Sequence, residues 1–177
     1  MRVAVFGSYD WNSYPDFMRS ITVFIQNAHE LGHDNVIFVH TGKNGAENMV
    51  TEYVGKTQKF LKEKNPNLKV WGIDTYGSVF KKYKETGIFD KNEIYPYITE
   101  GIGEDFLPAN VDFNIIDHFE KVSDKDAAIY TREIARKEGI FVGNSAGSAI
   151  AGLLQLKDHF KAGETVVVIF HDHGTRY

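Results

Sequence analysis

The stretch Gly-Ile-Phe-Val-Gly-Asn-Ser-Ala-Gly-Ser at residues 139–148 decides how this chain is interpreted. Its apolar part, residues 140–142, predicts a short strand, and the small residues after it predict a turn into a helix over 146–156. Such a turn presents backbone N–H groups and a serine hydroxyl at a helix N-terminus, which favours phosphates, other anions and ring nitrogens. The sequence therefore predicts a polar binding site that includes Gly143 and Ser145.

Ser145 also has a purely structural interpretation. Serine is a preferred N-cap residue, because its hydroxyl accepts a hydrogen bond from the unpaired N–H groups at the start of a helix. Helix capping and ligand binding use the same exposed geometry, so the residues alone leave both interpretations open.

Short apolar runs alternate with amphipathic segments along the rest of the chain. Strands are predicted at 3–6, 36–39, 68–73, 115–122, 140–142 and 165–170. Helices are predicted at 13–31, 46–61, 124–138 and 146–156, and one or two short helices within 74–110. Alternation of this kind favours parallel strands with right-handed crossovers. We predict one α/β domain over residues 1–177, a three-layer Rossmann-like sandwich with a mainly parallel sheet.

The composition is that of an ordinary globular domain. The chain has 177 residues, of which 42% are hydrophobic and 25% charged, with a net charge of −4 and no cysteine. These values leave no electrostatic case for nucleic acid or an anionic membrane as a partner, and they exclude thiol catalysis and disulfides. No apolar run is long enough for a signal segment or a membrane span. We expect a soluble protein of the cytoplasm.

From about Phe60 to Tyr177 the chain resembles the C-terminal part of the cysteine synthase and cystathionine β-synthase family, the fold-type-II pyridoxal-phosphate enzymes. The pieces that carry this resemblance occur in family order and cover about two-thirds of the chain: 60–66, 70–74, 100–108, 138–148 and 167–177. In that family the serine matching Ser145, beside Gly143, hydrogen-bonds the pyridine nitrogen of the cofactor. The loop matching Gly101-Ile102-Gly103 lines the active-site mouth and moves as substrate binds.

Two parts of the family pattern are missing from the sequence. The lysine that forms the Schiff base and the Ser/Thr-Gly-Asn loop that grips the substrate carboxylate have no recognisable match, and Lys43 lacks the flanking residues of the family lysine. The phosphate-cupping Gly-Thr-Gly-Gly-Thr loop is replaced by residues 41–46. We therefore assign no catalytic residue, and pyridoxal phosphate stands only as the cofactor of the parent family.

Residues 1–58 instead resemble, over a shorter stretch, a different group, the nucleotide-binding superfamily of DprA and the lysine-decarboxylase-like LOG proteins. The resemblance rests on a Gly-Ser turn after the first strand and a glycine-rich turn after the second. It implies a phosphate or nucleotide site at Gly7, Ser8, Thr41, Gly42, Asn44 and Gly45. Ordinary turns with glycine at positive φ are the alternative. The chain resembles a hybrid (a chimera) whose two segments, 1–58 and 59–177, join near Lys59.

Other polar clusters have simpler explanations. The run His171-Asp172-His173 places two histidines on one side of an extended chain, but a zinc site needs three or four ligands with supporting groups around them. We therefore assign no metal. Asp124 and Asp126 are interpreted as helix-capping residues, and Glu104 and Asp105 as a solvated loop.

The sequence leaves three hypotheses for the function of the chain. The leading hypothesis is a hybrid scaffold without intact pyridoxal-phosphate catalysis, which keeps weak affinity for a small phosphate-bearing ligand. The second is a pyridoxal-phosphate enzyme that makes cysteine or cystathionine by β-replacement. The third is a nucleotide-binding module governed by residues 1–58. We also expect homo-oligomers to form through the apolar surface that the missing half of the family fold would cover.

Overall fold

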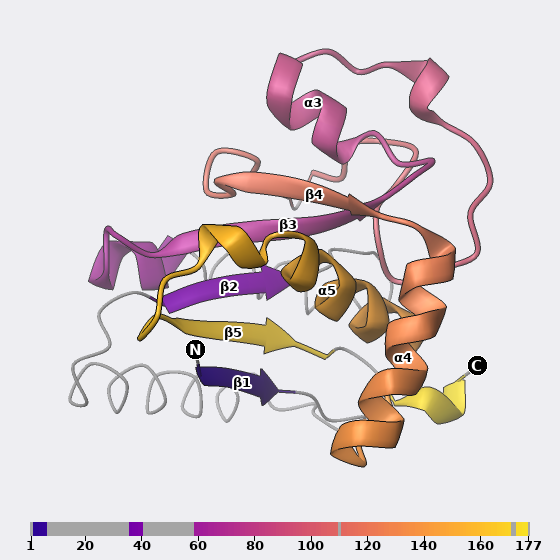
Figure 1. Cartoon of the computed structure of the whole chain (residues 1–177). Helices are drawn as coiled ribbons and strands as arrows, with labels where there is room; N and C mark the ends of the chain where they lie inside the picture. Colours follow the sequence, from indigo (N-terminus) through magenta and orange to yellow (C-terminus); the bar gives the residue numbers. More distant parts are fainter. Residues whose placement is uncertain (1, 7–35, 41–58, 110, 171–172, 177) are drawn as a thin grey trace.

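The computed structural model describes residues 2–6, 36–40, 59–109, 111–170 and 173–176. The strands in these ranges form one sheet in the order β1-β5-β2-β3-β4, and every pairing is parallel. Their bounds are β1 Arg2–Phe6, β2 Val36–His40, β3 Lys69–Thr75, β4 His118–Val122 and β5 Thr165–Ile169. The predicted α/β class with a mainly parallel sheet is confirmed (Figure 1).

The last strand in sequence, β5, is central in the sheet. It lies between β1 and β2, and all five of its residues are buried. A continuous apolar run of this kind is typical of a parallel strand that is covered on both faces. The register pairs Phe6 with Ile169 and Val39 with Val168, so neighbouring strands end at the same edge of the sheet.

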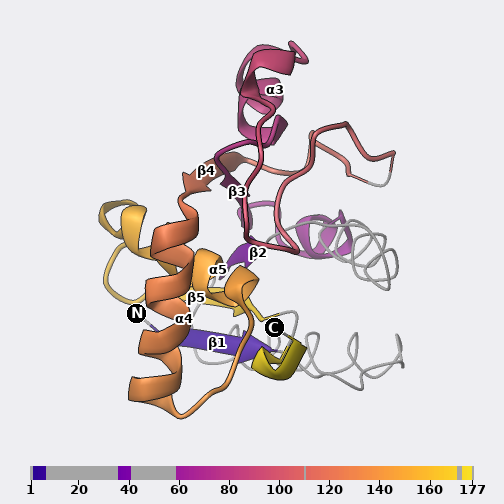
Figure 2. The same ribbon diagram turned by 90° about the vertical axis from the view of Figure 1, so that its right-hand side faces the viewer.

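Helices cover both faces of this sheet. The helices α4, Asp124–Glu138, and α5, Asn144–Gln155, pack on one face, where Val166 and Val168 of β5 join the cluster around α5. Val167 and Ile169 point to the other face and pack with Leu61 of the helical segment 59–64, as expected for side chains that alternate along a strand. Figure 2 shows α4 and α5 on one side of the sheet and the segment 59–64 on the other.

Helix α4 has the caps that the sequence predicts. The hydroxyl of Ser123 accepts a hydrogen bond from the backbone N–H of Asp126 at 3.1 Å. At the other end Gly139 adopts φ +69°, a left-handed conformation that glycine reaches without steric cost. The predicted start and end of this helix are therefore confirmed.

The prediction of a short strand at 140–142 is wrong. Only Val142 forms a bridge, an isolated antiparallel one to His173, while Ile140 and Phe141 are exposed. Helix α4 ends at Glu138 and α5 begins at Asn144, two residues before the predicted start, so too few residues remain between them to enter the sheet. The apolar run is a helix-to-helix connection.

The region 74–110 contains the short helices that were predicted. These are α3, Phe80–Thr86, and a single 3-10 turn, η1, Lys91–Glu93. The predicted strand at 115–122 is shorter than expected, because β4 begins only at His118. The predicted helix at 13–31 and most of the one at 46–61 lie outside the described residues. Within the described ranges, no helix is long and apolar enough to span a bilayer.

The close packing of α5 on α4 generates a test. A Cβ atom at Gly147 would clash with the carbonyl oxygen of Ala127 and with Thr131 Oγ1, so Gly147→Ala forces the two helices apart. Although alanine favours helix, we expect the free energy of unfolding to fall by about 1–3 kcal/mol in urea denaturation. The control Gln155→Ala, at an exposed position of the same helix, should change it by less than about 0.5 kcal/mol. Equal stability of the two variants would contradict the packing.

Candidate functional site

Ser145 lies in the first turn of α5 and is almost fully buried, with 1% of its surface exposed. The N-cap position is Gly143, which has no side chain and therefore makes no side-chain capping bond. Ser145 is thus inside the first turn rather than at the N-cap, so the interpretation of its hydroxyl as an N-cap group does not apply. It lies at a helix N-terminus, where backbone N–H groups carry partial positive charge.

The turn Gly101-Ile102-Gly103 approaches Ser145 from the segment before β4. Gly101 and Gly103 have φ of +79° and +63°, and a Cβ at Gly101 would lie 3.4 Å from Ser145 Cβ. Ile102 between them is fully buried in the core cluster that includes α5. The structure therefore brings Gly101 and Ser145 together, as the sequence predicts, with the buried Ile102 as the anchor of the turn.

The other side of this turn contacts the end of β3. A Cβ at Gly103 would lie 2.5 Å from Ser78 Cβ and 2.8 Å from Asp74 Oδ1. Ser78 Oγ accepts a hydrogen bond from the Glu104 N–H at 3.1 Å, and the Val79 N–H donates to the Glu104 carbonyl oxygen at 3.1 Å. Gly103 thus belongs to the contact with residues 74–79 rather than to the contact with Ser145.

Asp74 is the buried carboxylate at this contact. It has no exposed surface, and Oδ2 accepts the Lys81 N–H at the start of α3 at 2.9 Å. Among the residues that the structure describes, none donates a hydrogen bond to Oδ1. Burial raises the pKa of Asp74, opposed by the nearby Ser78 hydroxyl and the Lys81 N–H. Sequence reasoning missed Asp74 and Ser78, although an aspartate that ends an apolar strand is a signal for such a site.

Asp124 joins the first turn of α4 to residues 98–99, which precede the Gly101–Gly103 turn. Its carboxylate accepts the N–H groups of Ile98 at 2.9 Å and Thr99 at 2.8 Å, and the Thr99 hydroxyl at 2.6 Å. Burial raises the pKa of Asp124, but these three bonds outweigh it and hold the pKa below its ordinary value. Asp124 is therefore more than the capping residue predicted, because it holds residues 98–99 against α4.

A pocket of about 540 Å³ opens beside this segment. Residues 94–100, Gly77, Glu104 and Asp105 line it. The pKa of the half-buried Tyr97 is raised to about 12, first by burial and then by the negative charges of nearby carboxylates, Glu104 foremost. The interpretation of Glu104 and Asp105 as a solvated loop holds for the exposed Asp105 but not for Glu104. The Glu104 N–H donates to Ser78 Oγ, and its carbonyl oxygen accepts the Val79 N–H.

Several predicted site residues lie outside the described residues. These are Gly7, Ser8, Thr41, Gly42, Asn44 and Gly45, together with Lys43, His171 and Asp172. The strands that precede the two glycine turns, β1 and β2, end at Phe6 and His40 on the edge where β5 also ends. Within the described part of the chain, no three His, Cys, Asp or Glu side chains are grouped so as to hold a metal ion.

Comparisons with known proteins give a consistent result. The family model "Pyridoxal-phosphate dependent enzyme" matches residues 53–172. A cysteine synthase of Helicobacter pylori (strain J99 / ATCC 700824) is 38% identical over 122 residues, covering 67% of this chain and 36% of the relative. The O-acetylserine dependent cystathionine beta-synthase of Bacillus subtilis (strain 168) is 34% identical over 139 residues, covering 78% of this chain and 42% of the relative.

Solved structures agree with the sequence relatives. The crystal structure of O-acetylserine dependent cystathionine beta-synthase from Helicobacter pylori has a TM-score of 0.64 and 33% identity, covering 85% of this chain and 44% of that one. An O-ureido-L-serine synthase, 23% identical with a TM-score of 0.66, shares the fold. The chain thus spans less than half the length of these relatives.

The unpaired oxygen of Asp74 generates a test with a defined pH dependence. Because the pKa of Asp74 is raised in the folded state, its ionisation destabilises the fold as the pH rises from the ordinary value of 3.8 through the raised pKa. The asparagine of Asp74→Asn has no ionisable group, so this variant should not lose stability in this pH range. We expect it to be more stable than the wild type by about 1–3 kcal/mol at neutral pH, because the amide buries no charge at this position.

The measurement is urea denaturation of both proteins at a series of pH values. The stability difference should grow as the pH rises and stop changing below 3.8, where Asp74 is protonated in both states. Asp158→Asn, which changes an exposed aspartate, is the matched control. If the difference in unfolding free energy between the wild type and Asp74→Asn is the same at every pH, Asp74 is not a buried carboxylate that titrates.

Proposed function

Because this chain belongs to the family of pyridoxal-phosphate-dependent enzymes, we propose that it binds the cofactor ring at Ser145 but does not, by itself, carry out the family's covalent catalysis. The observation that carries the proposal is the contact between the turn at Gly101 and the buried Ser145 at the start of α5. Both residues belong to segments that match the family in sequence. Gly143, the N-cap residue of α5, completes the proposed ring site, whereas Gly103 packs against residues 74–79.

The donors at this site fit a pyridine ring. A serine hydroxyl can donate a hydrogen bond to a neutral ring nitrogen, and the first turn of a helix adds favourable partial positive charge. Gly101 brings only backbone to the side of Ser145, because a side chain there would combine a positive φ with a Cβ 3.4 Å from Ser145 Cβ.

The chain's own residues would position the ring and cover it. When bound, pyridoxal phosphate supplies an electron sink for chemistry at the carbon next to an amine. Ser145 would orient the ring through its nitrogen, and the Gly101–Gly103 turn would shield that face from water. The family's covalent step also needs a lysine amine. The buried Lys121 does not offer one, because its Nζ donates to the Ser78 carbonyl oxygen at 2.9 Å and to Glu93 Oε2 at 2.6 Å.

Catalytic β-replacement, which makes cysteine or cystathionine, is the alternative. It is favoured by the names of the relatives, a cysteine synthase and a cystathionine beta-synthase at 38% and 34% identity. The chain covers only 36% and 42% of their lengths, and the family lysine has no recognisable match in its sequence. The lack of a match for this lysine favours the non-catalytic proposal.

The phosphate of the ligand is proposed to lie at the glycine turns after β1 and β2, at Gly7, Ser8, Thr41, Gly42, Asn44 and Gly45. The ends of these strands at one edge of the sheet support this, since open α/β sheets bind ligands there. The hybrid origin and the nucleotide-binding alternative stay predictions, because both of the families that the sequence resembles place a strand, a glycine turn and a helix at this point. Self-association and a cytoplasmic location also stay predictions.

Binding of pyridoxal phosphate to two serine variants tests the proposal. We expect Ser145→Ala to weaken binding about three- to tenfold, the size of one lost hydrogen bond, in a titration followed by cofactor absorbance. Ser148→Ala is the matched control, because the Ser148 hydroxyl donates to the Asn144 carbonyl oxygen of its own helix at 3.2 Å. It should leave the affinity unchanged.

The same samples separate the alternatives. After borohydride treatment, mass spectrometry should show no cofactor fixed to a single lysine, and O-acetylserine should not be turned over. A specific lysine adduct with turnover would establish the β-replacement enzyme instead. Thermal stabilisation by a nucleotide, without any binding of pyridoxal phosphate, would establish the nucleotide-binding module.

A further inference from the structure

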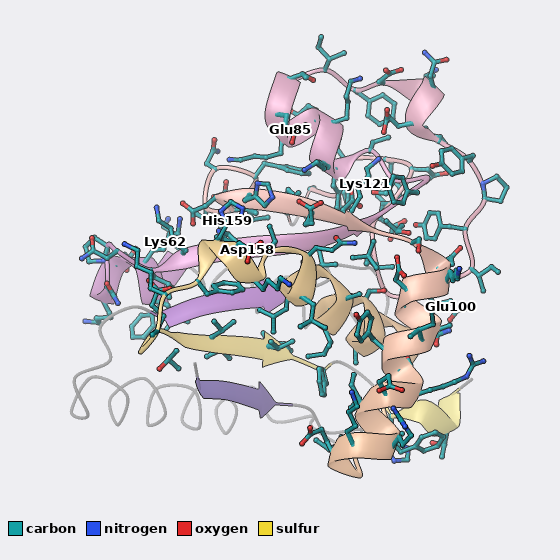
Figure 3. All side chains as sticks on the ribbon, viewed as in Figure 1. Lys62, Glu85, Glu100, Lys121, Asp158 and His159 are labelled. Atoms are coloured by element: carbon teal, nitrogen blue, oxygen red, sulfur yellow. The ribbon has the colours of Figure 1, made fainter. Side chains whose placement is uncertain are left out.

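The first turn of α4 holds the residues that lead into the Gly101–Gly103 turn. Asp124 Oδ2 accepts the Ile98 N–H at 2.9 Å, and Oδ1 accepts the Thr99 N–H at 2.8 Å and the Thr99 hydroxyl at 2.6 Å. Only Glu100 separates Thr99 from the first glycine of the turn. Figure 3 shows Glu100 beside the start of α4, at the opposite end of the molecule from Asp158. The turn is therefore attached to α4 directly before its first glycine.

Hydrogen bonds to a charged group supply much of this attachment. Ile98 has 78% of its surface exposed and Glu100 is exposed too, so apolar packing does not hold these two neighbours of Thr99. Burial raises the pKa of Asp124, but its three hydrogen bonds outweigh burial and hold the pKa below its ordinary value. The carboxylate is therefore ionised at neutral pH, and hydrogen bonds to an ionised acceptor are stronger than those between neutral groups.

The other side of the turn is held separately. Ile102 is fully buried in the core cluster that includes α5, and the Glu104 N–H donates to Ser78 Oγ at 3.1 Å. Gly101 lies between the two attachments and has no side chain to anchor it. The position of its backbone opposite Ser145 therefore depends on the residues on either side of it.

The attachment to α4 and the proposed ring-binding serine belong to one pair of packed helices. Asp124 lies in the first turn of α4, and Ser145 lies in the first turn of α5. The helices are in close contact, because a Cβ at Gly147 of α5 would clash with the Ala127 carbonyl oxygen of α4. By holding residues 98–99, Asp124 thus ties the glycine turn to the same helix pair that carries the serine.

These bonds are additional to the capping of α4. The N-cap residue is Ser123, whose hydroxyl accepts the Asp126 N–H at 3.1 Å and donates to Asp126 Oδ2 at 2.7 Å. Asp124 and Asp126 both lie in the first turn, where negative charge is favourable. Asp126 therefore matches Asp124 in charge and helix position, while its carboxylate bonds to the cap.

We propose that Asp124 is a positioning residue of the ring site, which it controls through residues 98–99. With this carboxylate in place, the backbone of Gly101 is held opposite Ser145 before a ligand enters. A site that is already ordered loses little conformational freedom on binding, so its affinity is higher. The inference rests on the proposed binding of a cofactor ring at Ser145, and it names the residue outside the site that sets the affinity.

The variants Asp124→Asn and Asp126→Asn test the proposal as a matched pair. Asparagine has one acceptor oxygen and a donor NH₂, so at position 124 it cannot accept from both Ile98 and Thr99 through separate oxygens. The probe is pyridoxine 5′-phosphate, which has the ring and the phosphate but no aldehyde that condenses with lysine. In calorimetric titration we expect Asp124→Asn to bind it about fivefold more weakly than the wild type. Asp126→Asn should bind it as the wild type does.

A spectroscopic signal separates positioning from a general loss of stability. Circular dichroism in the absorption band of the ring depends on a fixed, asymmetric setting of the bound probe. At saturating probe this signal should fall in Asp124→Asn and stay unchanged in Asp126→Asn. A purely structural role of Asp124 would lower the stability and leave the signal of the folded, saturated protein unchanged.

Thr99 tests the same contact without changing the charge of α4. Thr99→Val keeps the shape and the N–H but removes the hydroxyl that donates to Asp124 at 2.6 Å, so we expect about threefold weaker binding. Thr99→Ser keeps the hydroxyl and should bind the probe as the wild type does. These variants carry the test if Asp124→Asn does not fold.

Failure of this inference is distinguishable from failure of the ring site. Unchanged affinity in folded Asp124→Asn, or in Thr99→Val if Asp124→Asn does not fold, would overturn the positioning role and leave the ring site in place. Equal weakening by Asp126→Asn would do the same. A wild type that does not bind pyridoxine 5′-phosphate would overturn the ring site, and this inference with it.

Discussion

The site depends on one steric constraint, which is that the turn Gly101–Gly103 fits between two buried elements. On one side its backbone reaches Ser145 in the first turn of α5, and on the other it packs against Ser78 and Asp74. Both glycines have positive φ, and any side chain at Gly103 would overlap these neighbours. The hydrogen bonds of Glu104 to Ser78 and Val79 then close the contact. The proposed ring site is built on the side of this turn that faces Ser145.

The parallel sheet brings these elements to one edge. Because β5 lies in the centre and all the pairings are parallel, the ends of the strands and the start of α5 converge there. Helix α5 approaches closely through its glycines, with Gly147 against α4 and Gly152 against Ile73 of β3. Small residues in this helix therefore set the position of Ser145. The same packing explains why the binding groups gather at one end of the molecule.

Local rules predicted much of the fold and only part of the site. The apolar run of β5 and the caps of α4 at Ser123 and Gly139 were predictable, because each depends on residues close in sequence. The strand expected at 140–142 was not found, since three apolar residues between two helices resemble a buried strand in sequence alone. Asp74 and Ser78 were missed because their contact with Gly103 joins segments distant in sequence. The small-residue turn into a helix pointed to Ser145, and the family resemblance added the role of its hydroxyl.

Hydrogen exchange at the amide of Glu104 tests the central contact most directly. This N–H donates to Ser78 Oγ, so we expect the Glu104 amide to be protected from exchange in the wild type. In Ser78→Ala its protection factor should fall about tenfold. The Gly139 amide, which donates to the Ala135 carbonyl oxygen at the end of α4, should be unaffected. A Glu104 amide that exchanges as fast as an unstructured peptide in the wild type would contradict the claim that this turn is held in place.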